Sequence, residues 1–417
     1  MRLQFWGDLA GTGFGTVTRD LGRALLDLGH DVRFVSQNDT GELEEPFASR
    51  TFEVTPDLVD QDVAMVLGEK SSLSLNPAGI LRLIRGELWQ DAWRPEAAIM
   101  LGDFVNVRRM VMADTETAQA FSTLPTYHYV PIEGVDLPPS WEAMWHILHP
   151  IAMSEFGADQ IERVTGYRPP VIYHGTDIEQ FRPVSPERPL YLTTGQRTIK
   201  LRSKAECKRF FGSKANRWIL RTDRFMPRKR YASFLRALAP ILADRPDTVL
   251  VMHCRSTDEG GHLYDLFSKY PREIASRMIV TGFHDRHGGA PRDILTALYN
   301  AADIYASNSA EGFGLTIAEA LACGTPAVGM AYSAVPEVIG PAGLLAPVNR
   351  LDDNEYDHAW ATVDEPAFGQ AVATLLDNDV QRRSLGRLGP EHVRANFTWT
   401  HAAAQFADAM TLQEAVA

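Results

Sequence analysis

The sequence of 417 residues contains little cysteine and no long apolar run. Its three cysteines, Cys207, Cys254 and Cys323, are too few for a disulfide framework, and their spacing resembles no zinc site. No stretch of ~18 or more apolar residues occurs, so we expect no transmembrane segment. An acid and glycines interrupt the first residues, where a signal peptide needs an unbroken apolar core. These absences predict a cytoplasmic protein.

Positive charge is also scarce, because 41 Lys and Arg residues face 53 Asp and Glu residues, for a net charge of -12. A broad nucleic-acid surface needs clustered basic residues, so we expect no extensive one. The same balance disfavours an anionic membrane as a large contact surface, although peripheral membrane contact stays open. A small basic pocket for one phosphorylated ligand remains compatible with this charge. The length predicts two or three domains.

The first forty residues alternate between strand and helix patterns. A short apolar run at 3–6 precedes a glycine-rich loop at 7–15, and apolar residues then recur at helical spacing as far as residue 28. A second apolar run follows at 32–35. This order is typical of a βαβ unit, which implies a parallel sheet covered by helices.

The alternation continues along the chain and is interrupted by a proline-rich linker at 181–189. We therefore predict an α/β protein with two doubly wound, Rossmann-like domains, 1–183 and 184–396, facing across a cleft that holds the ligand. A terminal helix over 397–417 should pack back on the first domain. Residues 144–153 fit either a strand or a helix. Further predicted strands cover 63–67, 97–101, 127–130, 171–173, 218–221, 248–253, 278–281, 303–306 and 327–330, and further helices cover 231–242, 263–267, 294–300 and 315–322.

The most informative segment contains two glutamates eight positions apart. Glu311 precedes the helix predicted at 315–322, and Glu319 lies within it. Gly314 frees the backbone, and its amide lies with those of Leu315 and Thr316 at the amino end of the helix. Amide donors and the helix dipole together form an anion site. One carboxylate can accept hydrogen bonds from sugar hydroxyls, and the other can reach a ribose diol.

This run resembles the core of the retaining GT-B glycosyltransferases of glycosyltransferase family 4, whose hallmark is a pair of glutamates with seven residues between them. The resemblance implies that Glu311 contacts the donor sugar and that Glu319 contacts the ribose of the nucleotide. It also implies that the amides of Gly314 and Leu315 hold the diphosphate, with Phe313 and Thr316 beside the donor.

Other segments resemble the same family in the right order, over about residues 1–400. Arg224 and Lys229 have its Arg–Lys spacing and would face the diphosphate. Two cations there would stabilise a leaving diphosphate, as a metal does elsewhere, so we expect neither a metal nor a cofactor. The run at 171–177 resembles the family's strand-His-Gly-x-Asp signature and assigns His174 to the donor side. Gly13 and Gly15 belong to a loop expected near the donor phosphates or the acceptor.

One stretch departs from the family pattern. Many members carry a histidine at the end of an amino-domain strand, near the anomeric carbon. Here the corresponding stretch, 126–134, has His128 within the predicted strand and Glu133 nearer its end. We therefore count Glu133 with Arg224, Lys229 and Glu311 as a candidate catalytic residue, and the acceptor side stays open.

Several plainer interpretations compete with these assignments. The two glutamates and the basic pair could be solvated surface charges, and His174 could be a structural residue. The glycine loop lacks the third glycine of a nicotinamide-dinucleotide fingerprint. We predict a metal-independent, retaining transfer of a sugar from a nucleotide sugar to an unidentified acceptor. The alternatives are a nucleotide-sugar epimerase or glycan phosphorylase on the same fold, and a non-catalytic nucleotide-sugar-binding protein.

Overall fold

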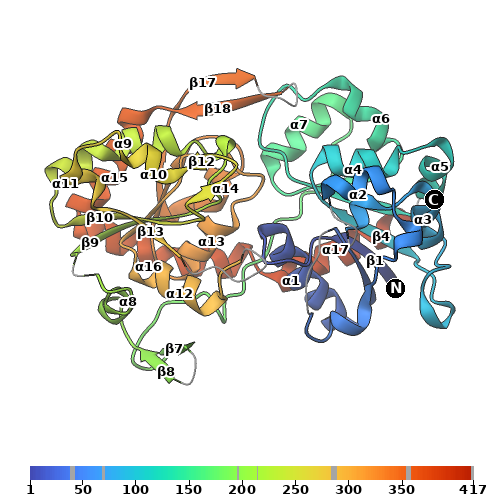
Figure 1. The fold of residues 1–417 in the computed structure, drawn as a ribbon, viewed down its shortest axis with the longest axis horizontal. Helices are drawn as coiled ribbons and strands as arrows, with labels where there is room; N and C mark the ends of the chain where they lie inside the picture. The colour runs from blue at the N-terminus through green and yellow to red at the C-terminus, as the bar shows by residue number, and fades with distance from the viewer. Residues whose placement is uncertain are drawn as a thin grey trace. The chain divides into compact units, whose positions relative to one another are not determined.

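The computed structural model describes residues 1–37, 43–67, 71–194, 197–213, 215–282, 289–353 and 358–414. They form two compact units (Figure 1). Of the described residues, unit 1 comprises those within 1–175, Gly289 and 399–414, and unit 2 comprises the others within 176–398. The first boundary lies before the predicted 183/184, because residues 176–183 pack on unit 2. The side-chain amide of Gln180 donates to Thr296 Oγ1 at 2.8 Å, and the side-chain amide of Asn300 donates to the Arg182 carbonyl at 3.0 Å.

Unit 1 is built on one parallel six-stranded sheet in the order β3-β2-β1-β4-β5-β6. Every residue of β4 and β5 is buried, which explains why β4 is apolar throughout rather than alternating. The strands are β1 Arg2–Gly7, β2 Asp31–Ser36, β3 Thr51–Phe52, β4 Ala97–Leu101, β5 Thr126–Val130 and β6 His149–Ala152. The helices are α1 Gly13–Asp27, α2 Gln61–Leu67, α3 Pro77–Ile84, α4 Phe104–Val111, α5 Thr115–Thr123, α6 Glu142–Trp145, α7 Glu155–Thr165 and α17 Trp399–Glu414.

The terminal helix α17 belongs to unit 1, although it follows the whole of unit 2 in the sequence. It packs against α1. The Tyr129 ring meets the Phe406 ring edge-on, with centroids 5.0 Å apart, and the Tyr127 hydroxyl reaches the Met410 carbonyl at 3.5 Å. Apolar burial of α17 therefore ties the end of the chain to the first sheet.

Unit 2 repeats the same strand order in a second parallel six-stranded sheet, β13-β10-β9-β14-β15-β16. The doubly wound, Rossmann-like architecture predicted from the sequence is thus confirmed in each unit. The strands are β9 Arg217–Thr222, β10 Thr248–His253, β13 Met278–Thr281, β14 Ile304–Ala306, β15 Ala327–Met330 and β16 Gly343–Ala346. The helices are α8 Lys204–Phe210, α9 Tyr231–Asp244, α10 Leu263–Phe267, α11 Arg272–Ala275, α12 Arg292–Ala301, α13 Leu315–Ala322, α14 Val335–Ile339, α15 Glu365–Asp377 and α16 Asp379–Asn396.

Unit 2 also carries antiparallel hairpins that the sequence did not predict. Two of them, β7–β8 and β17–β18, lie outside the main sheet of the unit (Figure 1), and β11–β12 follows β10. Their strands are β7 Leu190–Thr194, β8 Arg197–Leu201, β11 Thr257–Asp258, β12 Gly261–His262, β17 Val348–Asp353 and β18 Ala359–Val363.

Some predicted elements of unit 1 differ from the structure. The strand predicted at 63–67 is wrong, because this segment forms helix α2, and the Asp60 carboxylate accepts the amides of Asp62 and Val63 at its start. A five-residue apolar run does not distinguish a helix from a strand by its periodicity. The open segment 144–153 contains the end of α6 and all of β6. The strand predicted at 171–173 is only an isolated parallel bridge between Val171 and Ala152.

Candidate active site

Lys229 lies in the loop that joins β9 to α9, in a 3-10 turn formed by Pro227–Lys229. Arg230 follows with a left-handed φ of 52°, which turns the chain into α9. The Lys229 side chain points into the protein, and the residue is only 6% exposed. Its Nζ lies 2.5 Å from Glu311 Oε1 and 3.3 Å from Asp223 Oδ1. A buried ammonium is therefore neutralised by two carboxylates, as burial of a charge requires.

Glu311 lies in the loop that joins β14 to α13, and the surrounding chain holds it in place. Its Oε1 accepts the Ser309 hydroxyl at 2.7 Å, and its backbone amide donates to Ser333 Oγ at 3.0 Å. Because β9 and β14 are neighbours in the sheet, their carboxyl ends bring Lys229 and Glu311 together across 82 residues of sequence. The order of strands reverses at this point, where open α/β sheets bind ligands.

Helix α13 begins at Leu315, as the glycine pattern predicted. Gly314 precedes it with φ of 108°, a left-handed conformation that favours glycine. Among the described residues, no side chain caps this end of α13. Its first amides, which include those of Leu315 and Thr316, thus leave the positive end of the helix dipole for an anion. The Phe313 side chain is buried instead, with its ring packed edge-on against Phe397 at 5.3 Å.

Glu319 lies more than one turn inside α13 and is 7% exposed. The Tyr299 hydroxyl donates to its Oε2 at 2.7 Å and also lies 3.1 Å from Thr222 Oγ1, at the end of β9. Thr316 joins the same polar face of the helix through a 2.7 Å bond to the Tyr305 hydroxyl. Burial raises the pKa of Tyr299 well above its usual value, so this phenol remains a proton donor to Glu319.

Arg224 does not share the environment of Lys229. Its side chain is 59% exposed and extends to the β11–β12 hairpin. Nε and Nη2 bind the two oxygens of Asp258 at 3.1 and 2.8 Å, and Nη2 also lies 2.8 Å from Glu259 Oε1. The structure therefore gives the two cations of the predicted pair different carboxylate partners, and a shared diphosphate contact stays a prediction.

The two glycines assigned to the donor lie at the start of α1 in unit 1. A Cβ on Gly15 would stand 1.9 Å from the Ala10 carbonyl oxygen, whereas a Cβ on Gly13 would meet nothing within 4 Å. The loop is closed by its own residues, since Asp8 accepts the Ala10 amide at 2.8 Å and Thr12 accepts the Gly15 amide at 2.9 Å. Close packing of the backbone is therefore sufficient to explain why residue 15 is a glycine.

His174 and His128 are both buried in unit 1. His174 Nδ1 lies 2.7 Å from the Tyr129 hydroxyl, and burial lowers its pKa to about 3. His128 lies within β5, where the Trp145 indole donates to Nδ1 at 3.2 Å and Nε2 faces the Gly102 carbonyl at 3.2 Å. Burial lowers the pKa of His128 to about 4, so both imidazoles are neutral at pH 7. Glu133 lies three residues beyond the end of β5 and is half-buried.

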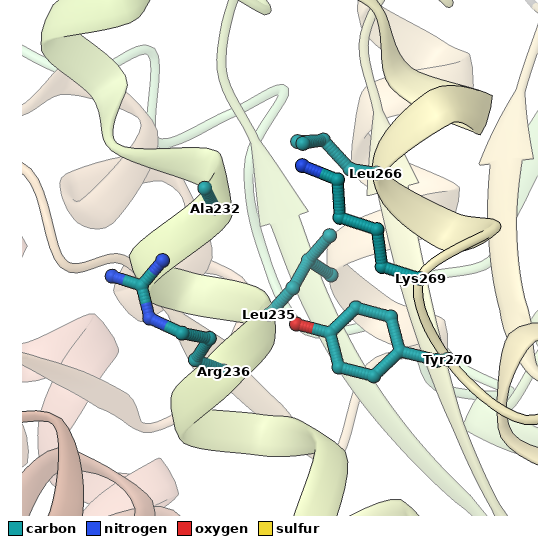
Figure 2. Close-up of a pocket in the computed structure, with 6 residues that line it drawn as sticks. All are labelled: Ala232, Leu235, Arg236, Leu266, Lys269 and Tyr270. Atoms are coloured by element: carbon teal, nitrogen blue, oxygen red, sulfur yellow. The ribbon is translucent and has the colours of Figure 1, made fainter.

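Three further observations concern metal sites, membrane-spanning helices and cavities. Among the described residues, no group of three or more His, Cys, Asp and Glu side chains is arranged to hold a metal ion. Within the same part of the chain, no helix is long and apolar enough to cross a membrane. A separate hollow of about 230 Å³ beside α9 contains none of the predicted site residues. Figure 2 shows the residues that line it, Ala232, Leu235, Arg236, Leu266, Lys269 and Tyr270.

The sequence reasoning missed two charged residues of this site, Arg221 and Asp223. Arg221 is the fifth residue of β9, and it is fully buried beneath the Lys229 turn. The signal was an arginine that directly follows the apolar run 218–220. Charged side chains are almost never fully buried unless they are paired, so an arginine inside a predicted buried strand indicates a specific partner.

Residues 216–378 match the family model described as Glycosyl transferases group 1, and this range contains Lys229, Glu311 and Glu319. The chain is 33% identical over 187 residues to D-inositol 3-phosphate glycosyltransferase of Corynebacterium aurimucosum, which covers 43% of this chain and 40% of the relative. It is 24% identical over 234 residues to a GDP-mannose-dependent monoacylated alpha-(1-6)-phosphatidylinositol monomannoside mannosyltransferase of Corynebacterium glutamicum. This match covers 54% of this chain and 51% of the relative. The chain thus spans about half or less of the length of these curated relatives.

Solved structures show the same fold over the whole chain. Sucrose-phosphate synthase from Thermosynechococcus elongatus has a TM-score of 0.71 at 17% identity and covers 100% of both chains. Anabaena Alr3699/HepE in complex with UDP and glucose has a TM-score of 0.71 at 14% identity and covers 99% of both chains. The fold is therefore GT-B, and the resemblance to the group 1 glycosyltransferases that the sequence predicted is confirmed.

Proposed function

We propose that this chain is a glycosyltransferase that moves a sugar from a nucleotide-sugar donor to an acceptor, with retention of anomeric configuration and without a metal. The observation that carries the proposal is the Lys229–Glu311 pair at the point where the sheet of unit 2 reverses its strand order, inside the segment that matches the group 1 glycosyltransferase model. Donor and acceptor binding are part of this proposal, as is a cytoplasmic location.

The residues around this pair suit a nucleoside diphosphate sugar. The uncapped amino end of α13 and the Lys229 ammonium both favour a diphosphate. Glu311, two residues before Phe313, can accept hydrogen bonds from sugar hydroxyls. Glu319 can accept hydrogen bonds from a ribose diol in place of the one that it accepts from the Tyr299 hydroxyl. Lys229 is buried, so its charge acts through a medium of low dielectric, where it stabilises a leaving group more than an exposed charge would.

The proposed reaction needs no base from the protein. The bond between the anomeric carbon and the diphosphate oxygen breaks, and the acceptor hydroxyl attacks the same face of the sugar. The acceptor proton passes to the departing phosphate oxygen, whose negative charge Lys229 stabilises. Exclusion of water during this step protects the donor from hydrolysis.

Relatives and neighbours support the substrate classes. Anabaena Alr3699/HepE has been solved with UDP-glucose, which favours a nucleotide sugar as the donor here. Several relatives are D-inositol 3-phosphate glycosyltransferases, so this phosphorylated cyclitol is the first acceptor to test. The base and sugar of the donor follow from neither observation.

The test begins with thermal stabilisation of the protein by UDP, GDP, ADP and their sugars, with and without EDTA. A ligand at tenfold its Kd should stabilise the fold by roughly 1.4 kcal/mol. We expect one nucleotide to act selectively, with no change in EDTA and with a smaller effect in Glu319→Gln. If no nucleotide stabilises the protein, the proposal is wrong.

Product analysis then separates the transferase from its alternatives. A transferase releases nucleoside diphosphate only when an acceptor such as D-inositol 3-phosphate is present, and NMR of the product should show the anomeric configuration of the donor. Release without an acceptor would instead indicate an epimerase. A requirement for inorganic phosphate would indicate a phosphorylase, and binding without any release would indicate a non-catalytic protein.

A further inference from the structure

The end of β9 places a buried arginine and a buried aspartate directly beneath Lys229. Arg221 and Asp223 are 0% and 5% exposed at their side chains, and Arg221 Nε donates to Asp223 Oδ2 at 3.0 Å. Neither residue belongs to the Arg–Lys spacing or the glutamate pair that the sequence resemblance singled out. Their burial next to the proposed donor site requires a physical account.

Arg221 ties this strand end to the two loops that form the site. Nη1 donates to Asn308 Oδ1 at 3.0 Å, in the loop that leads to Glu311. Nη2 donates to the backbone carbonyl of Lys229. The planar guanidinium thus holds three partners in a fixed geometry, which a lysine at this position could not do.

Aromatic rings complete the environment of the guanidinium. Its carbon lies 4.1 Å from the ring centroid of Tyr231 and 4.6 Å from that of Phe234, both on α9. Cation–π contacts of this kind stabilise a desolvated arginine. Arg221 is therefore a rigid support on which the Lys229 turn rests.

Asp223 links this support to the Lys229 side chain. Its Oδ2 accepts Arg221 and the Ser307 hydroxyl, the latter at 3.2 Å, while its Oδ1 faces Lys229 Nζ at 3.3 Å. Burial alone would raise the pKa of Asp223. The charges of Lys229 and Arg221 outweigh burial and hold this pKa below its usual value, so Asp223 is ionised at pH 7.

Charges alternate along this row, from Arg221 to Asp223 to Lys229 to Glu311. A lysine side chain is long and flexible, so a single partner would leave its ammonium free to follow that partner or to reach solvent. Glu311 is also the residue expected to turn toward a sugar. A second carboxylate on the rigid strand end is what can hold the ammonium while Glu311 and a phosphate exchange.

We propose that Asp223, clamped by Arg221 and Ser307, is a positioning residue that keeps the Lys229 ammonium in place when a phosphate group of the ligand replaces Glu311 as its second partner. This role rests on the proposed function, because it assumes that Lys229 contacts a diphosphate. It assigns a site function to two residues that lie outside the motifs described above.

The competing explanation is that Asp223 merely stabilises the fold, and the chain offers a matched control for it. Asp303 is a carboxylate of unit 2 whose side chain is 6% exposed, and its Oδ2 lies 2.6 Å from Lys208 Nζ and accepts the Trp218 amide at 2.8 Å. It precedes β14, at the opposite end of the strand from Glu311. Asp223→Asn and Asp303→Asn therefore both break a buried aspartate–lysine pair, but only the first does so beside Lys229.

The experiment is a double-mutant cycle on binding of the nucleoside diphosphate that stabilises the wild-type protein, measured by calorimetry. The variants are Asp223→Asn, Lys229→Gln, the double variant and Asp303→Asn. We expect Asp223→Asn to weaken binding about tenfold in the wild-type background and less than twofold in Lys229→Gln, because the aspartate acts through the lysine. Asp303→Asn should lower the melting temperature and leave the affinity unchanged. Asp223→Asn should also lower kcat for transfer by a larger factor than it raises the KM of the donor.

Other outcomes overturn the role. The role is wrong if Asp223→Asn weakens nucleotide binding equally in the wild-type and Lys229→Gln backgrounds. It is also wrong if Asp303→Asn weakens binding as much as Asp223→Asn does, or if Asp223→Asn has no effect on binding. If Asp223→Asn does not fold, Ser307→Ala removes one support of Asp223 without stranding a charge, and it should weaken binding two- to threefold only when Lys229 is present. Failure of the wild-type protein to bind any nucleotide would overturn the proposed function as well, and the wild-type titration alone reports that result.

Discussion

The two units share one strand order but treat the carboxyl ends of their strands differently. In unit 1 the helices that follow β1, β4 and β6 are capped by their own side chains, Thr12, Asp103 and Ser154. In unit 2 the helices that follow β9 and β14 have Arg230 and Gly314 at their N-cap positions, and among the described residues neither N-cap side chain makes a capping hydrogen bond. In unit 2, uncapped helix starts and the buried Lys229 therefore lie at the same edge of the sheet.

This difference indicates what each sheet edge can bind. A capped helix has already satisfied its first amides, so it offers little to an anion. An uncapped helix end beside a buried cation retains that capacity. Topology alone thus provides two equivalent positions, and capping and charge favour unit 2 in our proposal for the phosphate of the donor. The predictions below test this contrast, beginning with the largest expected effect.

The largest effect is expected when the buried ammonium of Lys229 in unit 2 is removed. Lys229→Gln should lower kcat about 10²- to 10³-fold, the range for loss of one charged donor to a transition state, with a smaller loss of donor affinity. Lys208→Gln, which breaks the buried pair with Asp303, is the matched control and should change kcat less than twofold. Steady-state kinetics with saturating acceptor measures both. Equal losses in kcat and affinity would contradict a transition-state role.

The second test concerns the glycine loop of unit 1. Gly15→Ala should lower the free energy of unfolding by about 1–3 kcal/mol, because its Cβ would meet the Ala10 carbonyl at 1.9 Å. Gly13→Ala has open space and should be neutral or slightly stabilising. Denaturant melts of both variants give the comparison. If Gly13→Ala preserves stability but abolishes nucleotide binding, the loop contacts the donor and the contrast between the units is too simple.

The third test compares one carboxylate from each unit. Glu319→Gln should weaken nucleotide binding about tenfold, which corresponds to ~1.4 kcal/mol for a lost charged hydrogen bond. Glu133→Gln should leave nucleotide affinity unchanged and lower turnover, if it acts on the acceptor side. Calorimetry and initial rates on the same preparations separate the two effects. Loss of nucleotide affinity in Glu133→Gln would place part of the donor on unit 1.

The last test concerns the stability of the protein at acid pH. His128 and His174 have folded-state pKa values of about 4 and about 3, below the unfolded value of ~6.5. The unfolded chain therefore binds more protons between these values, so this stability is present above pH ~6.5 and is lost as the pH falls, by roughly 1.4 kcal/mol per histidine per pH unit. Hydrogen exchange at pH 7 and pH 5 should show unit 1 loosening first. His128→Gln should flatten this dependence, and unchanged protection of β5 at pH 5 would count against it.

Much of the local structure was predictable from the sequence because it depends on short-range patterns. The segments predicted at 97–101, 315–322 and 327–330 coincide with β4, α13 and β15. Each is a strongly apolar stretch that begins directly after a glycine, a proline or a polar residue, so its start is marked locally. Helix α2 was not predictable in this way, because its short apolar run does not distinguish a helix from a strand. The hairpin strands β8 and β17 contain charged residues rather than an unbroken apolar run.

The sequence by itself determined the residue types and the spacing of Glu311, Glu319 and Lys229, because these are local properties. Only the tertiary structure decided which of these side chains meet. The pairing of β9 with β14 brings Lys229 to Glu311, and the pairing of β9 with β10 brings Arg224 to Asp258. Arg221 and Asp223 are buried beneath the site. The physical reason is that the order of strands in a sheet depends on how apolar faces are buried across the whole unit, and no local pattern records that order.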